Sequence, residues 1–230
     1  MDPDQWRKVP GSDAPMRKLK FVVSLWTVVA ILAPEVGYAA PPEMPRQGRV
    51  ANPKPENYSP EQKAMAERIV TQVGGDAPRG PFALLLHTPN IADGALSLFS
   101  AFRFQNRLPQ RLLELMILTV ARQWSGQYEW FAHAPRALSA GLDPADIEAI
   151  RLGRVPKLDG ADERLVYDLV GELTTRRALS PATYAKAKAA LGEEPLIELI
   201  SATGYYTMIS IILVAFEVPP PAPSPEKPLP

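Results

Sequence analysis

A nearly continuous apolar helix, interrupted by one carboxylate, is the feature that most constrains this chain. Between residues 112 and 120, every side chain is apolar except Glu114 and Thr119. A helix that is apolar around its whole circumference is typical of the interior of a helical bundle. A charged side chain is rarely buried without a partner. The segment therefore predicts a central buried helix with a charged cluster around Glu114.

The next helical segment carries polar side chains on one stripe. Glu129, His133 and Arg136 follow one another at i, i+4 and i+7, which places them on the same helix face. A histidine, with an ordinary pKa near 6.5, can both give and take a proton around neutral pH, and a carboxylate one turn away can orient its ring. Glu114, Glu129 and His133 are therefore the candidate catalytic residues of an acid–base site.

A purely structural interpretation of these residues remains open. A histidine in a helix is often a structural residue, and an i, i+4 pair such as Glu129 and His133 can be a surface contact of about 0.5 kcal/mol or less. Glu114 could equally be a buried partner of Arg111 or Arg122, since paired charges do occur in bundle cores.

Composition excludes several kinds of chemistry. The 230 residues contain no cysteine, so disulfides, thiolate nucleophiles and cysteine-bound metals are all excluded. With only two histidines, His87 and His133, no metal site is expected, and we interpret His87 as structural. Lys and Arg total 25, as do Asp and Glu, so the charge gives no indication of a nucleic-acid partner.

The N-terminus has the pattern of a secretory signal peptide. Basic residues precede an apolar run at 21–33, and small residues follow it. We assign 1–39 as the signal peptide, with cleavage after Ala39 and Met16 as a better start than Met1. The run is shorter than the roughly 20 residues needed to span a bilayer, so no stable membrane anchor is expected after cleavage. The prediction is an exported protein, periplasmic in a bacterium.

Proline marks the edges of the folded unit. Six prolines fall between residues 41 and 60 and seven between 219 and 230. We therefore divide the mature chain into a Pro-rich linker at 40–58, a helical domain at 59–218 and a Pro-rich tail at 219–230. Both flanks are expected to be extended and mobile, although the tail could instead be a docking peptide.

Within that frame the pattern is helical throughout. Helix starts are marked by Ser59 with Pro60 and Gln62, by Asp143 and by Ser180, and no long segment alternates with period two. The predicted fold class is all-α, a compact multi-helix bundle. The last segment, 196–216, is long and apolar enough to span a membrane, but its polar interruptions favour a buried or oligomer-facing helix.

The chain resembles the carboxymuconolactone decarboxylase family, relatives of the alkylhydroperoxidase-like proteins. The resemblance covers residues 59–218 and rests on LPQRLLEL, VAR, YEWFAH and ALSAGL within 108–142, together with GYYTMIS at 204–210. Matched onto the hydroperoxidase branch, Glu114 takes the place of the relay glutamate and His133 that of the histidine. Gly126 and Glu129 stand where that branch has two cysteines, so thiol-dependent peroxide reduction is not expected.

The resemblance implies a lyase that needs no cofactor. Its substrate would be a small carboxylated lactone or related organic acid, and loss of carbon dioxide would leave an enolate to be protonated. His133 would be the acid, oriented by Glu129, with Glu114 as a relay whose pKa burial would tend to raise. The candidate substrate-binding residues are Arg122 and Arg136 for a carboxylate, with Tyr128 and Trp130 as walls.

The resemblance also implies a homo-oligomer, a trimer or a hexamer, assembled through apolar faces such as the 204–208 segment. A second function stays open beside the lyase. The chain could be a non-catalytic helical oligomer that binds a small acid or serves as a scaffold.

Overall fold

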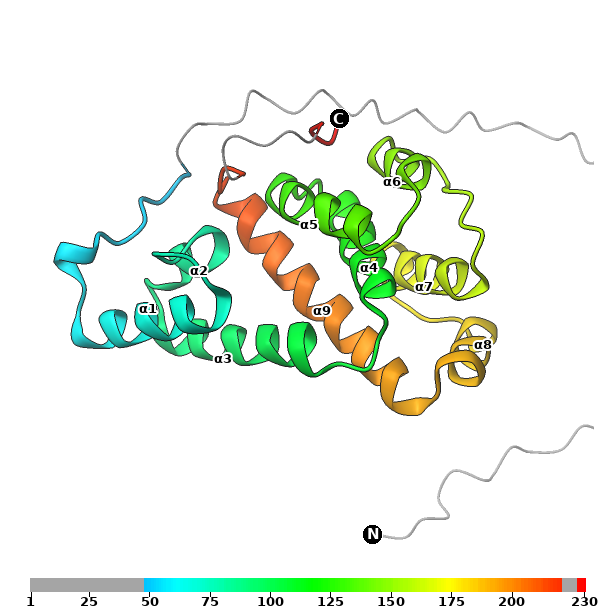
Figure 1. Ribbon diagram of the computed structural model, residues 1–230, viewed down its shortest axis with the longest axis horizontal. Helices are drawn as coiled ribbons and strands as arrows, with labels where there is room; N and C mark the ends of the chain where they lie inside the picture. Colours follow the sequence, from blue (N-terminus) through cyan, green and yellow to red (C-terminus); the bar gives the residue numbers. More distant parts are fainter. Residues whose placement is uncertain (1–47, 221–226) are drawn as a thin grey trace, which may run out of the picture. The chain divides into compact units, whose positions relative to one another are not determined.

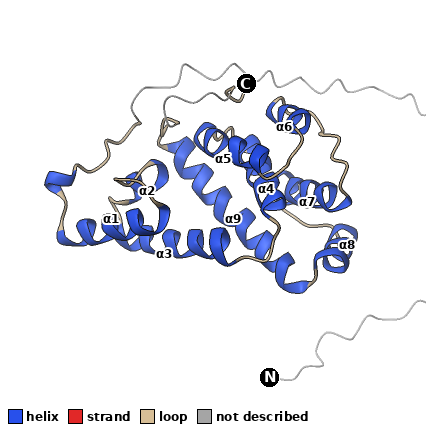
Figure 2. Ribbon diagram, in the orientation of Figure 1, coloured by secondary structure: helices blue, strands red, loops and turns tan. Residues whose placement is uncertain are grey.

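A computed structural model describes residues 48–220 and 227–230 of the chain. Within these residues the structure has nine α-helices and no strand, which confirms the all-α prediction (Figures 1 and 2). The predicted signal peptide at 1–39 lies outside the described residues. The helices are α1 (Pro60–Val73), α2 (Gly80–Leu85), α3 (Pro89–Ser100), α4 (Gln110–Gln123), α5 (Gln127–Ser139), α6 (Pro144–Arg151), α7 (Ala161–Gly171), α8 (Pro181–Leu191) and α9 (Glu193–Ala215). Of three short helical turns, η1 (Pro55–Asn57) precedes α1, η2 (Ala101–Gln105) follows α3, and η3 (Glu172–Arg176) follows α7.

The helix starts follow the predicted capping residues. The Ser59 hydroxyl accepts a hydrogen bond from the backbone N–H of Gln62, whose side chain accepts from the Ser59 N–H in return. Asp143 and Ser180 cap α6 and α8 in the same local manner. Each cap satisfies backbone N–H groups that have no partner inside the helix, so these boundaries depend only on neighbouring residues.

The central helix is α4, as its apolar sequence predicts. It packs against α5, α6, α7 and α9, and every residue from 112 to 121 is buried, including Glu114. Its position brings the one carboxylate of the apolar segment into the middle of the core.

The long helix α9 is the only one in the described part of the chain whose length and composition would allow it to cross a membrane. It packs against α2, α4, α5 and α8. Leu199, Tyr205, Tyr206 and Ile209 are buried on its inner side. These contacts are those of a core helix, whereas Ile197, Ile211 and Val214 are exposed on another side.

The described parts of the two Pro-rich flanks pack against the helices. Arg49 pairs with Glu217, and its backbone N–H donates to the carbonyl of Phe216. At the other end, residues 227–230 lie against α5, with Leu229 almost fully buried (Figure 1). These contacts join both flanks to the helical domain, and composition alone did not predict them.

Candidate functional site

Glu114 and His133 meet in the core between α4 and α5. The two helices are joined by three residues, 124–126, so α5 begins beside the end of α4 and packs along it. His133 Nδ1 lies 2.7 Å from Glu114 Oε2, and both side chains are buried. The structure thus brings together two candidate residues that are 19 positions apart in the chain.

The other oxygen of Glu114 is held from outside α5. Glu114 Oε1 accepts hydrogen bonds from Arg103 Nη1 at 2.7 Å and from Gln110 Nε2 at 2.5 Å. Arg103 comes from the π-helical turn η2, and its side chain is also largely buried. The carboxylate therefore has one cationic partner on each side, so its burial is compensated by two charges and an amide.

The two arginines that the sequence offered as partners of Glu114 lie elsewhere. Arg111 pairs with Asp162 and Glu163 on α7. Arg122 places its guanidinium against Gly153, after α6. A buried carboxylate needs some cation, but sequence spacing could not identify which one the fold brings to it.

The cluster shifts its own pKa values in opposite directions. Burial alone would lower the pKa of His133, but the hydrogen bond to Glu114 and the negative charges of Glu114 and Glu129 outweigh it and raise that pKa. Burial alone would raise the pKa of Glu114, yet His133 and Arg103 outweigh it and lower that pKa. The expectation that burial raises the Glu114 pKa is therefore wrong in net effect. An imidazolium between carboxylates is the favoured state.

Glu129 faces the second ring nitrogen of His133. Its Oε2 lies 3.2 Å from His133 Nε2 as an ion pair, without the geometry of a hydrogen bond. Among the described residues, this buried oxygen and the buried hydroxyl of Tyr206 have no hydrogen-bond partner. The Tyr206 ring meets His133 edge to face, with ring centres 5.5 Å apart. Unpaired buried polar atoms are uncommon, so both are available to a bound molecule.

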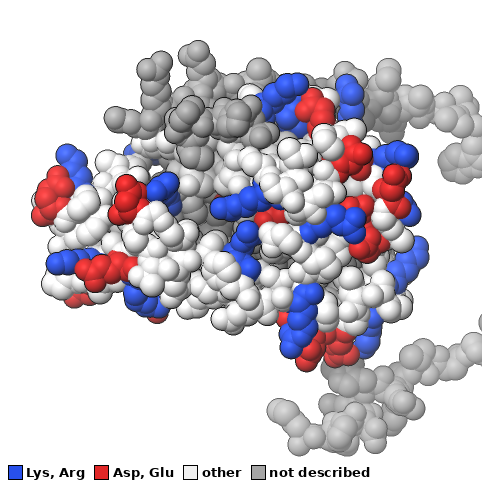
Figure 3. Space-filling view, in the orientation of Figure 1, with Lys and Arg blue, Asp and Glu red and all other residues white. Residues whose placement is uncertain are grey.

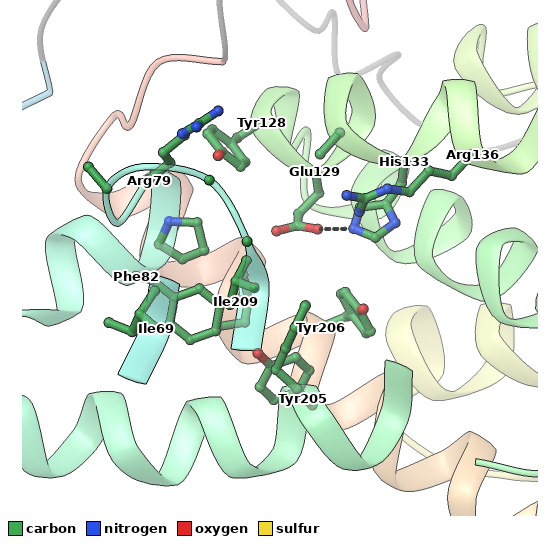
Figure 4. Close-up of a pocket in the computed structure, with 17 residues that line it drawn as sticks. Ile69, Arg79, Phe82, Tyr128, Glu129, His133, Arg136, Tyr205, Tyr206 and Ile209 are labelled. Carbon is green, nitrogen blue, oxygen red and sulfur yellow. Dashed lines mark ion pairs between the residues drawn. The ribbon is translucent and has the colours of Figure 1, made fainter. Parts of the chain in front are cut away.

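These groups line a cavity of about 380 Å³. Figure 4 shows Glu129, His133 and Arg136 along one side, with Tyr205 and Tyr206 below them and Phe82 and Ile69 opposite. Arg79, in the loop before α2, lies at the same end of the cavity as Tyr128 (Figure 4). The cavity therefore combines two arginines, one histidine and one glutamate with an otherwise mostly apolar and aromatic wall, the usual make-up of a small-molecule site.

A close contact fixes Tyr128 against the start of α2. Gly80 has a φ of +54°, and a side chain at this position would collide with the Tyr128 ring. Glycine tolerates both the backbone conformation and the close approach. The burial of Tyr128 raises the pKa of its phenol, and the charge of Glu129 adds to that effect. Tyr128 therefore lines the cavity as a neutral wall.

Three of the seven predicted site residues do not line the cavity: Glu114, which holds His133 Nδ1, and Trp130 and Arg122, which lie elsewhere. Trp130 is buried on another side of α5, where its Nε1–H donates to the backbone carbonyl of Lys227. Arg122 lies near Gly153, as described above. Trp130 does not line the cavity because a helix turns about 100° per residue, which directs it away from the stripe of Glu129 and His133, whereas Arg122 belongs to α4.

Sequence reasoning missed four residues of the site: Arg79, Arg103, Gln110 and Tyr206. Gln110 had a usable signal, since it precedes Glu114 by four residues on one helix. Arg103 had a weaker signal: it is a single cation between two phenylalanines in the sequence, a position that favours partial burial. Arg79 and Tyr206 had none, because their elements reach the cavity only through the tertiary fold.

The described residues contain no group of three His, Asp or Glu side chains arranged to hold a metal ion.

Charges on the molecular surface are mixed. In the face drawn in Figure 3, basic and acidic side chains are interspersed, without a broad patch of one sign. Ion pairs between such exposed side chains contribute little to stability.

Comparisons with known proteins bear on the fold. No protein-family model matches the chain, and no curated protein matches it. Among solved structures, the chain is similar to an uncharacterized peroxidase-related protein from Silicibacter sp. TM1040, with a TM-score of 0.65 and 15% sequence identity. The match covers 80% of this chain and 96% of that one. The protein thus shares its all-α fold with this peroxidase-related protein.

Proposed function

We propose that this protein is a cofactor-independent acid–base enzyme acting on a small carboxylated compound, with the chemistry of the carboxymuconolactone decarboxylase type. The observation that carries the proposal is the position of His133. One ring nitrogen is held by buried Glu114, while the other lies at the cavity wall beside Glu129. General acid catalysis needs a proton donor whose orientation is fixed and whose donating atom can reach the substrate.

The proposed reaction follows from the charges around the cavity. The bond between the substrate carbon and its carboxylate breaks, and the electron pair passes into the conjugated lactone carbonyl as carbon dioxide leaves. His133 Nε2 then donates its proton to the resulting carbanion carbon. Glu129, whose Oε2 is 3.2 Å from that nitrogen, returns a proton from solvent. The raised pKa of His133 keeps the acid loaded at neutral pH.

Arg136 and Arg79 supply the binding charge in this proposal. Both line the cavity, and a guanidinium can hold a carboxylate by two parallel hydrogen bonds. This assignment keeps Arg136 from the sequence prediction and replaces Arg122 by Arg79. Tyr128 and Tyr206 supply aromatic walls, and the Tyr206 hydroxyl offers an unpaired polar group to the substrate. Thiol chemistry has no place here, since the chain lacks cysteine.

The proposal is tested by incubating the purified protein with a panel of unsaturated lactone acids and aromatic acids. We expect turnover of at least one compound, lost by about a hundredfold or more in His133→Asn. Arg136→Met should raise KM, while Arg122→Met, a matched change of an arginine that does not line the cavity, should leave KM unchanged. Equal turnover in the His133→Asn variant would defeat the proposal.

A binding protein without turnover is the second candidate, and one observation favours it. The alternating series Arg103, Glu114, His133, Glu129 is already balanced in charge without any ligand. A cavity with two arginines could then capture an acid without transferring a proton. Ligand-induced thermal stabilisation with no product, in both the unmodified protein and His133→Asn, would identify this function.

Export and assembly belong to the same proposal. The signal-peptide pattern at 1–39 supports a periplasmic protein, and secretion of the protein with cleavage after Ala39 would test it. Tyr205 and Tyr206 of the predicted contact segment 204–208 are buried inside the chain. The exposed apolar side chains of α9, Ile197, Ile211 and Val214, instead support a homo-oligomer. A light-scattering mass equal to one chain would exclude the oligomer.

A further inference from the structure

The last four residues of the chain make a specific contact with α5 and α6. The Gln127 side chain donates from Nε2 to the Leu229 carbonyl at 2.9 Å and accepts the Leu229 N–H at 3.0 Å. Trp130 Nε1–H donates to the Lys227 carbonyl at 3.1 Å. Arg151 Nη1 donates to the Pro228 carbonyl at 2.7 Å. Three successive carbonyls of the tail are therefore each held by a different side chain.

The tail sequence fits these partners for a chemical reason. Proline has no backbone N–H, so in the segment Pro228, Leu229, Pro230 the leucine alone offers both a donor and an acceptor. One carboxamide, that of Gln127, satisfies both groups. The side chain of Leu229 is 1% exposed, while those of Lys227, Pro228 and Pro230 are exposed. Backbone hydrogen bonds with one buried side chain are the usual means of recognising an extended peptide.

We propose that Gln127, Trp130 and Arg151 form a peptide-docking groove for an extended Pro-Leu-Pro segment, occupied here by the chain's own C-terminus. By filling this groove, the tail acts as a strap on the first turns of α5. Gln127 and Trp130 lie on either side of Glu129 in the sequence, and His133 follows one turn later. The strap thus positions the helix that lines the cavity, and Gln127, Trp130 and Leu229 are positioning residues. The proposal does not depend on which reaction the cavity serves.

A spin label on the tail tests the docking directly. The chain has no native cysteine, so Pro230→Cys gives one labelling position at an exposed residue beside the anchor. We expect slow label motion in the full-length protein and fast motion after Gln127→Leu or Leu229→Asp. Gln123→Leu is the matched control, since it makes the same change at an exposed position near the end of α4 and should leave the label slow. A label that moves fast without any second change, or that stays slow in Gln127→Leu, would overturn the docking groove.

Hydrogen exchange of α5 tests the positioning role. In Leu229→Asp the amides in the first turns of α5 should exchange about tenfold faster or more, while those of α7, which the tail does not contact, should keep their rates. Unchanged exchange in α5 with a released tail would overturn the strap. A uniform increase in α5 and α7 would also do so, because it would indicate global destabilisation.

Two further measurements define the occupant. The label should stay slow on dilution, because docking within one chain does not depend on protein concentration. Mobilisation on dilution would overturn the assignment to the chain's own tail in favour of a second copy. A peptide with the sequence Glu-Lys-Pro-Leu-Pro, added in millimolar excess, should mobilise the label by competition, whereas Glu-Lys-Pro-Ala-Pro should not. Equal effects of both peptides would overturn recognition of the leucine.

Discussion

The two sides of α5 differ in how their buried polar side chains are paired. Both bury polar side chains, yet the cavity side does so with charges, Glu129 and His133 against Glu114, and the tail side with the neutral groups of Gln127 and Trp130. A buried charge requires a partner of opposite charge, whereas a buried amide requires only hydrogen bonds. The cavity side should therefore respond to pH. The tail side should not, because Gln127 and Trp130 carry no charge and Arg151 of α6, which also holds the tail, stays protonated.

Removing Glu114 should produce the largest effect. Glu114→Ala leaves Arg103 and His133 as buried cations without their shared carboxylate, and we expect a loss of about 3–5 kcal/mol in the free energy of unfolding. Urea unfolding followed by circular dichroism measures it. Glu114→Gln is the control, because it keeps the volume and can still hydrogen-bond, and it should lose less. A change in Glu114→Ala within about 0.5 kcal/mol, the range of an ordinary surface substitution, would contradict the charge-compensation argument.

Replacing Leu229 by alanine should lower the free energy of unfolding by less than the loss of Glu114. Leu229→Ala removes a buried leucine side chain, but the tail can detach without unfolding the bundle, so the expected loss is about 1–2 kcal/mol. The same urea experiment measures it. Leu138→Ala, on the same helix but 52% exposed, is the control and should change stability by less than about 0.5 kcal/mol. A loss that varies strongly between pH 6 and pH 9, at about those values, would contradict the neutral character of this side.

The pH dependence of stability should separate the two sides. The pKa of His133 is raised in the folded protein, so its contribution is complete below the ordinary value of 6.5 and is lost as pH rises through the raised value. The pKa of Glu114 is lowered, so its contribution is present above 4.5 and is lost as pH falls through the lowered value. The contribution of the cluster to the free energy of unfolding should thus be greatest between pH 4.5 and pH 6.5, the ordinary pKa values of the two groups.

Thermal unfolding from about pH 6 to about pH 9 tests this sign. Between the ordinary value of 6.5 and the raised pKa, the unmodified protein should lose up to about 1.4 kcal/mol per pH unit relative to His133→Gln, and above the raised pKa the difference should stay constant. Leu229→Ala should follow the unmodified protein in slope. If His133→Gln and the unmodified protein had parallel profiles, the imidazolium assignment would be wrong.

The smallest effect on stability is expected at Arg136. Its side chain is exposed at the cavity, so Arg136→Met should change the free energy of unfolding by less than about 0.5 kcal/mol. Affinity for a small carboxylate should nevertheless fall about tenfold, since a charge-assisted hydrogen bond contributes about 1.5 kcal/mol or more. Calorimetric titration measures the binding. A large loss of stability with unchanged affinity would show that Arg136 is structural.

How far the sequence predicted the site depended on the distance between partners. The stripe of Glu129, His133 and Arg136 could be predicted because side chains three and four residues apart on a helix must share a face. The same periodicity places Trp130 on another face of α5, so its predicted place in the cavity wall is wrong. The partner of Glu114 was missed because Arg103 reaches it from a π-helical turn. That turn changes the side-chain direction that an α-helical register would give.

The sequence by itself determined the elements and the need for charge compensation. Caps at Ser59, Asp143 and Ser180 depend on hydrogen bonds within three residues, and an apolar segment around Glu114 must be buried wherever it lies. Only the tertiary structure decided which cation meets that carboxylate, which side of α5 lines the cavity, and that Leu229 returns to cover the other side. Those contacts join residues up to 102 positions apart, and they form only when the whole bundle has packed.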